Sequence, residues 1–325
     1  MRKFWKNNRR ELTIIIGIIL MFTLFTIINP VYISPKNLRD ILEQSVIYGL
    51  MGFGMTYVII TGGIDLSSGA TLALTSVTLG YMLTNGVPIL LALLLALLFG
   101  ALFGFINGIL VSYMHLQPFI ATMGTMQMYR GIAYVVTKGL PISGIPSTYR
   151  KIIYSEIVPG SLIRTSSIIL VLVAIILGII LRKTRFGSYL YAVGGNEEAT
   201  KLSGINVNYA KIGAYIVSGI CATIAGMIMI AKLGTAEPTA AQNYEMNAIA
   251  AAAIGGVSMS GGRGTIFGTF VGAILFSGLK IGLIVSGVDS YWQFVTTGIV
   301  IVIAAYIEIA QTKLAERKLI KGSSK

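Results

Sequence analysis

Long hydrophobic stretches constrain the fold of this chain more than any other feature of its sequence. About 20 consecutive apolar residues cross a hydrocarbon core of about 30 Å as a helix. The stretches are unbroken and do not alternate residue by residue, which favours helices over a β-barrel. We predict ten spans, at residues 11–29, 41–61, 66–84, 88–112, 118–137, 166–181, 211–231, 244–258, 264–285 and 291–310.

The composition agrees with a protein that is mostly surrounded by lipid. Hydrophobic residues make up 55% of the 325-residue chain and charged residues only 11%, whereas soluble domains carry about 25% charged residues. The net charge of +13 comes from basic residues at the ends of the hydrophobic stretches. They lie on no amphipathic face with interleaved aromatic residues, so we expect no nucleic-acid partner. The predicted fold is an all-α polytopic membrane helix bundle.

The distribution of basic residues predicts the orientation of the chain. If residue 1 is cytosolic, sixteen Lys and Arg residues lie toward the inner side, with Lys211 at the edge of a span, and eight toward the outer side, with Lys280 near the outer end of its span; Arg130 falls within a span. This bias follows the positive-inside rule, and an even number of spans places both termini in the cytosol. We therefore expect cytoplasmic tails at 1–10 and 311–325, a transmembrane domain at 11–310, and a cytoplasmic loop at 182–210.

Two of the predicted spans, at 166–181 and 244–258, are shorter than the others. Each is either tilted into protein contacts or a broken or re-entrant helix that lines a cavity. Glycine-rich breaks at 61–69 and 254–264 each precede a span that begins with small residues. Their positions in the two halves of the chain hint at an internal duplication.

Glycines recur every four residues inside two of the spans. Gly100, Gly104 and Gly108 share one helix face, as do Gly268 and Gly272. Such faces allow the backbones of neighbouring helices to approach closely. We predict close helix packing there, with a hinge or a pore lining as the alternative.

The polar segment at 182–211 carries a complete signature of a short helix. Asn196 precedes the acidic residues Glu197 and Glu198, and Gly204 follows Ser203. An Asn N-cap, acidic residues in the first turn and a glycine after the last turn predict a helix over about 197–203. A helix this short is marginal in water by itself. It is either a plain connector or a docking surface for a cytosolic partner.

Neither catalysis nor cofactor binding is expected of this chain. The phosphate-binding pattern GxxxxGK[ST] is absent from the sequence,. His115 is the one histidine and Cys221 the one cysteine, so no catalytic triad, disulfide or Cys/His metal site is predicted.

A few polar residues lie within or beside the spans and are candidates for the translocation pathway: Asp65, Asn107, Gln127 and Arg130. Charged groups inside a membrane face protein or water. Alternative roles are a helix cap for Asp65, an ion pair or carbonyl contact for Arg130, and interhelical contacts for the two amides. Glu245 is expected at the membrane interface, as a favourable charge at a helix start.

Four motifs together resemble one transporter family. They are TYVIITGGIDLSSGATLAL at 56–74, GTMQMYRGIAYVVTKG at 124–139, RFGSYLYAVGGNEEATKLSGI at 185–205 and AIAAAAIGGVSMSGGRGTIFGTFVGAIL at 248–275. In this order they resemble permease subunits of bacterial ABC importers for ribose, xylose, arabinose and related monosaccharides. The resemblance covers residues 41–310 and is not specific to one sugar.

The resemblance implies a ten-helix permease of the bacterial inner membrane that pairs with a second copy or a close paralogue. It also implies cytosolic ATPase subunits, which use ATP and Mg²⁺, and an extracytoplasmic sugar-binding protein. By motif match, the residues expected against the ATPase are Gly194, Gly195, Asn196, Glu197, Glu198, Ala199, Ser203 and Gly204.

Two other classes of function compete with this interpretation. The first is an ion-coupled secondary transporter of a small polar solute, for which Asp65 is the candidate carboxylate. The second is a structural membrane scaffold, which the glycine-interrupted spans disfavour.

Overall fold

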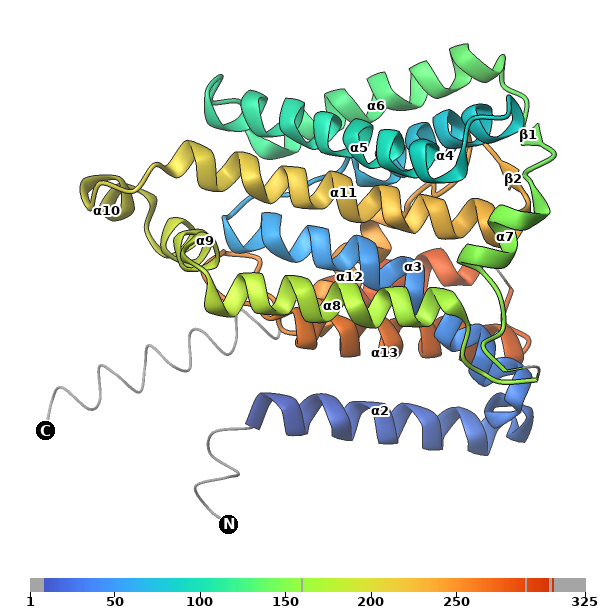
Figure 1. Cartoon of the computed structure of the whole chain (residues 1–325). Helices are drawn as coiled ribbons and strands as arrows, with labels where there is room; N and C mark the ends of the chain where they lie inside the picture. Colours follow the sequence, from blue (N-terminus) through green and yellow to red (C-terminus); the bar gives the residue numbers. More distant parts are fainter. Residues whose placement is uncertain (1–8, 159, 290, 304–305, 307–325) are drawn as a thin grey trace, which may run out of the picture.

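The computed structural model describes residues 9–158, 160–289, 291–303 and 306 of the chain, and the surroundings of side chains from residue 17 onward. This part is a bundle of helices (Figure 1) with a short antiparallel pairing of β1 (Ile142–Ser143) with β2 (Thr235–Ala236). The helices are α2 Arg9–Ile28, η1 Pro30–Ile33, α3 Pro35–Ile60, α4 Ser68–Thr84, α5 Ile89–Ser112, α6 Pro118–Thr137, α7 Ser147–Ile153, α8 Thr165–Lys183, α9 Arg185–Gly195, α10 Glu197–Leu202, α11 Val207–Leu233, α12 Tyr244–Ile254, α13 Ile266–Val285 and a helix at Tyr291–Ile303.

The all-α prediction is confirmed, and a helix lies at each of the ten predicted ranges. Four of these helices, α5, α8, α11 and α13, are long and apolar enough to cross a membrane. The number of crossings and the side of the termini stay predictions. Most of the predicted tails, at 1–10 and 311–325, and the end of the span at 291–310 lie outside the described residues.

Among the starts of the helices, that of α3 differs most from its prediction. The helix begins at Pro35, six residues before the predicted span at 41–61. The side chain of Ser34 accepts a hydrogen bond from the N–H of Asn37, and Pro35 occupies the first helical position. Both features stabilise a helix start. The apolar stretch therefore underestimates the helix, because its first turns are polar.

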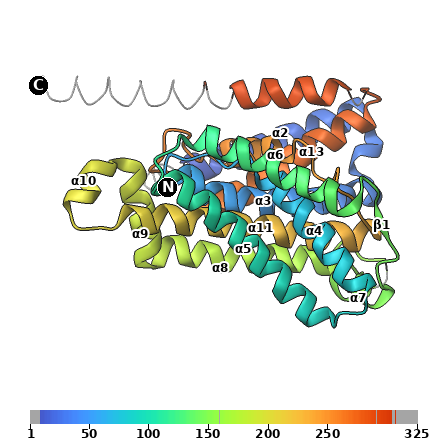
Figure 2. The same ribbon diagram turned by 90° about the horizontal axis from the view of Figure 1, so that it is seen from above.

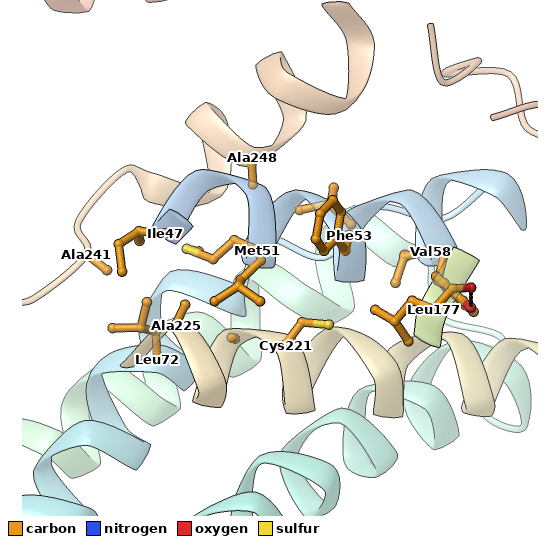
Figure 3. Close-up of a cluster of buried hydrophobic side chains, with 14 of the residues drawn as sticks. Ile47, Met51, Phe53, Val58, Leu72, Leu177, Cys221, Ala225, Ala241 and Ala248 are labelled. Atoms are coloured by element: carbon orange, nitrogen blue, oxygen red, sulfur yellow. Dashed lines mark hydrogen bonds between the residues drawn. The ribbon is translucent and has the colours of Figure 1, made fainter. Parts of the chain in front are cut away.

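The core of the bundle is formed around α3, in which every residue from 45 to 60 is buried. Figure 3 shows α3 between Cys221 and Ala225 of α11 on one side and Ala248 of α12 on the other. In contrast, only 22% of the apolar window of α5 and of α8 is buried. These two helices present leucine and isoleucine outward, which requires a lipid surrounding.

The predicted close-packing glycine faces are confirmed. A Cβ atom at Gly104 would meet the carbonyl oxygen of Tyr215 and the Cα of Ile216 in α11. The second face packs on α12, where a Cβ at Gly272 would meet the carbonyl of Ala251. These neighbours are backbone atoms, which cannot rotate aside as a side chain can.

We predict that Gly104→Ala lowers the free energy of unfolding of the purified protein by about 1–3 kcal/mol, because the added methyl group overpacks the α5–α11 contact. Gly124 of α6 is the matched control, since a Cβ there has nothing within 4 Å. Gly124→Ala should be neutral or slightly stabilising. Thermal unfolding in detergent micelles checks both, and equal stability of the two variants would contradict the packing argument.

Candidate coupling loop and polar network

The polar segment 182–211 forms two helices, of which the sequence analysis predicted one. The predicted helix is confirmed as α10, and its observed end is one residue earlier than predicted. The side chain of Asn196 accepts a hydrogen bond from the N–H of Ala199 at 2.9 Å. Gly204 follows with φ +78°, the left-handed conformation that glycine adopts without strain.

Helix α9 (Arg185–Gly195) was missed, although a signal for it exists in the sequence. Phe186, Leu190 and Val193 follow the i, i+4, i+7 spacing of a helix that packs on one face. Leu190 and Val193 are buried. The side chain of Thr184 caps the helix start by accepting a hydrogen bond from Gly187 N–H at 3.3 Å. The basic residues and glycines of this stretch had suggested a loop.

Helix α10 extends beyond the ends of α8 and α11, at the end of the bundle opposite β1, β2 and α7 (Figures 1 and 2). Residues 195–199 are exposed, as are Ser203 and Gly204. Two contacts hold this helix on the bundle. Thr200 is buried, and Lys211 of α11 forms an ion pair with Glu197 at 2.7 Å. The helix therefore projects from the bundle and is tied to α11 at its first residue.

Two large apolar side chains on this projection were not identified from the sequence. Leu202, the last residue of α10, is 90% exposed, and Tyr209, in the first turn of α11, is 68% exposed. No periodic pattern marks Leu202, because the surrounding residues are charged or small. Together with the capped helix, these side chains give the projection the apolar contact area that a protein partner needs.

Gly194 has a different position from the other predicted coupling residues, because it faces the bundle. A Cβ there would meet the carbonyl oxygen of Ile60, at the end of α3, and the N–H of Gly262. Gly262 N–H itself donates to the Ile60 carbonyl at 2.9 Å. The hydroxyl of Tyr191 donates to the carbonyl of Gly264 at 2.6 Å. The end of α9 thus touches the second glycine-rich break and the last carbonyl of α3, directly before the first break, and Gly261 lies against the N–H of Gly62 in the first break.

Asp65 is the centre of a buried polar network that joins four helices. Its Oδ1 accepts hydrogen bonds from the N–H and the hydroxyl of Ser67, at 3.0 and 2.7 Å, and its Oδ2 accepts from Ser218 at 2.6 Å. Asn107 donates to the Ser67 hydroxyl at 2.7 Å and accepts from Thr125 at 2.6 Å. The network connects the segment before α4 with α5, α6 and α11.

Of the four residues predicted for the translocation pathway, the structure brings Asp65 and Asn107 into this network and leaves the other two apart from it. Gln127 is exposed on α6. Arg130 donates to the carbonyls of Pro238 and Ala240, both at 2.7 Å, which is the carbonyl contact named above as an alternative.

The interfacial position predicted for Glu245 is wrong. It does lie in the first turn of α12, as predicted, but it is only 6% exposed. Its carboxylate packs against Gly69 at the start of α4. The reason is that α12 begins inside the bundle, where its first residue, Tyr244, packs against Tyr48 in the middle of α3.

Within the described ranges, no group of three His, Cys, Asp or Glu side chains is placed to hold a metal ion. Cys221, the one cysteine of the sequence, is buried in the core. The expectation of no cofactor in this chain stays a prediction.

Because Asp65 accepts three hydrogen bonds, we predict that Asp65→Ala strongly destabilises the fold. Each hydrogen bond to a charged group contributes roughly 1.5–3 kcal/mol, and the donors that remain would be buried without an acceptor. Asp65→Asn keeps one acceptor oxygen and should therefore lose less stability than Asp65→Ala. Thermal unfolding of the purified variants checks this order, and an alanine variant as stable as the parent would contradict the network.

Comparison with known proteins agrees with the family suggested by the motifs. Residues 37–305 match the family described as branched-chain amino acid transport system / permease component. No solved structure was found that matches the chain.

Curated relatives extend along nearly the whole chain. The ribose import permease protein RbsC of Bacillus subtilis strain 168 is 44% identical over 90% of this chain and 91% of its own length. The protein of the same name in Escherichia coli K12 is 38% identical over 94% of this chain and 95% of its own length. The galactose/methyl galactoside import permease protein MglC of Escherichia coli K12 is 33% identical over 98% of both. The chain is therefore a member of the family of transport-system permease components, a group of multi-pass membrane proteins.

Proposed function

We propose that this chain is the membrane permease subunit of an ATP-driven importer of a monosaccharide, with ribose as the first candidate. Its relatives named for ribose, galactose and allose import support a sugar as substrate. The highest identities among those compared here belong to the ribose proteins. The chain would cross the bacterial inner membrane ten times, with both termini and residues 182–211 in the cytosol.

The observation that carries the proposal is the projection formed by α10. It is rigidly capped, it is pinned by Thr200 and Lys211, and it exposes Leu202 almost completely. A cytosolic ATPase subunit is the partner that this surface would receive. ATP and Mg²⁺ would be bound by that subunit and not by this chain.

A displacement of α10 would reach the bundle through the few contacts of the neighbouring helix α9. Helix α9 ends at Gly195, directly before Asn196, and its last turn packs against Ile60, Gly262 and Gly264. Because these contacts involve backbone atoms, a displacement of α9 would act directly on the second glycine-rich break and on the end of α3, which leads into the first break. Closure of the ATPase would then tilt the helices that start at the two breaks, α4 and α13, as rigid bodies.

A second copy of the chain, or a close paralogue, would complete the pore. A sugar-binding protein would deliver the substrate at the opposite end, near β1, β2 and α7. The identity of the sugar would then depend on that protein and on the side chains along the path.

The rival, an ion-coupled transporter, depends on a carboxylate that exchanges protons or sodium with water. Asp65 is 1% exposed, and both its oxygens accept hydrogen bonds from serine groups. This arrangement supports a structural role for Asp65 and disfavours the rival.

The two mechanisms differ in their energy source. We predict that liposomes with this permease in the membrane, its ATPase on the inner side and its binding protein outside take up labelled ribose only when ATP is enclosed in the liposomes. Ionophores that collapse proton and sodium gradients should leave the rate unchanged. Uptake that ionophores abolish and ATP does not drive would reverse the assignment.

For the partner surface, we predict that Leu202→Glu prevents the ATPase from co-purifying with the permease. A charge on this residue would have to be desolvated at the interface. Leu233→Glu is the matched control, because Leu233 is 54% exposed at the opposite end of α11. Pull-down from detergent extracts measures both variants. Normal recovery of the ATPase with Leu202→Glu would show that this surface is not the contact.

For the route of force, we predict that Gly194→Ala uncouples ATP hydrolysis from uptake. The added methyl group would push α9 away from Ile60 and Gly262. Gly124→Ala in α6, away from the projection, is the control, since a Cβ there has nothing within 4 Å. The ratio of sugar imported to ATP hydrolysed should fall in the first variant only. An unchanged ratio in both would rule out this contact as the route.

A further inference from the structure

Residues 237–243, between β2 and α12, are non-helical backbone located deep inside the bundle. Helix α12 has 11 residues and spans only about 16 Å from its end at Ile254,. Its first residue, Tyr244, stacks edge-on against Tyr48 of α3 with ring centroids 5.3 Å apart. Tyr48 precedes the end of α3 at Ile60 by 12 residues, or about 18 Å,. Both lengths are close to half of a hydrocarbon core of about 30 Å.

The segment is fixed at this depth by contacts from two other helices. Arg130 of α6 donates to the carbonyls of Pro238 and Ala240. Gly69, at the start of α4, has no Cβ and thereby leaves room for the carbonyl of Ala241. Pro238 and Ala241 are buried, and Ala241 belongs to the same buried cluster as Ile47 of α3 (Figure 3). Contacts within the fold therefore hold residues 237–243 at this depth.

Three polar side chains of this segment are nevertheless exposed: Thr239, Gln242 and Asn243. Transfer of an unpaired amide into an apolar medium costs roughly 2–7 kcal/mol. Irregular backbone at membrane depth occurs only where protein buries it or where it lines a water-filled cavity. A lipid surrounding is thus excluded for this face of the segment.

The exposed surface continues onto α6. Gln127 precedes Arg130 by three residues and therefore lies on the same side of that helix. Gln127 is exposed, so an additional amide flanks the segment that Arg130 holds. Hydroxyl and amide groups that both donate and accept hydrogen bonds match the chemistry of a polyhydroxylated solute.

We propose that residues 237–243 and Gln127 line the aqueous path of the sugar at the middle of the membrane, where Thr239, Gln242 and Gln127 exchange hydrogen bonds with its hydroxyl groups. This inference rests on the proposed function and deepens it. Arg130 acts as a positioning residue that holds the segment in the path. The competing occupant of the face is a second copy of the chain packed directly against it without water.

Cysteine accessibility in the complete complex tests the proposal. The native thiol is removed by Cys221→Ala, and Gln242→Cys or Leu98→Cys is added; Leu98 is 64% exposed in the apolar helix α5. The complex, in lipid nanodiscs open to water on both faces, is treated with a charged methanethiosulfonate with and without ATP. Gln242→Cys should react at least about tenfold faster than Leu98→Cys, because the thiolate is the reactive species and forms in water. The reaction should also block uptake after reconstitution.

The outcomes separate this inference from the proposed function. If the unmodified complex imports ribose with ATP but Gln242→Cys reacts no faster than Leu98→Cys in either state, the segment does not line the path. Disulfide-linked dimers of Gln242→Cys without labelling would identify the dry contact with a second copy. Failure of ATP-driven uptake in the unmodified complex would instead contradict the proposed function itself.

Discussion

The backbone of a chain in lipid must satisfy its own hydrogen bonds, and the rest of this structure depends on that constraint. Continuous helices such as α5 and α8 meet it alone, with apolar side chains facing outward. The two glycine-rich breaks and residues 237–243 are not continuous helix, and contacts from other elements satisfy part of their backbone. The carbonyl of Ile60 receives the N–H of Gly262, and those of Pro238 and Ala240 receive Arg130. Irregular backbone is therefore concentrated where the protein can also change shape or pass a solute.

Glycine links this constraint to mechanism. At Gly104 and Gly272 the missing side chain brings helices into backbone contact, which stabilises the bundle without a hydrophobic driving force,. At Gly194 the absent side chain brings the end of α9, directly before the projection, against Ile60 at the end of α3 and Gly262. Close backbone contact transmits displacement with little loss, whereas long side chains would bend. The bundle can then respond as a few rigid bodies to an event at α10.

Much of the helical structure was predictable from the sequence, because hydrophobic length and helix capping act locally. The helix of α10 followed from Asn196, its two glutamates and Gly204 alone. Tertiary placement was not predictable. Nothing near Glu245 reveals that α12 starts inside the bundle, since Arg130, over 100 residues away, holds the preceding segment. Likewise, Asp65 and Ser218 meet only after folding, so a candidate for proton transfer could not be told from a structural carboxylate.

The central claim is that the projection around α10 faces the cytosol and receives force there. The most direct measurement is the labelling of Ser203→Cys, in a Cys221→Ala background, with a membrane-impermeant maleimide on intact cells and on inverted membrane vesicles. Ser203 is exposed in the structure. We expect labelling in inverted vesicles, reduced when the ATPase is bound, and none on intact cells. Labelling of intact cells would place the projection outside and contradict the account.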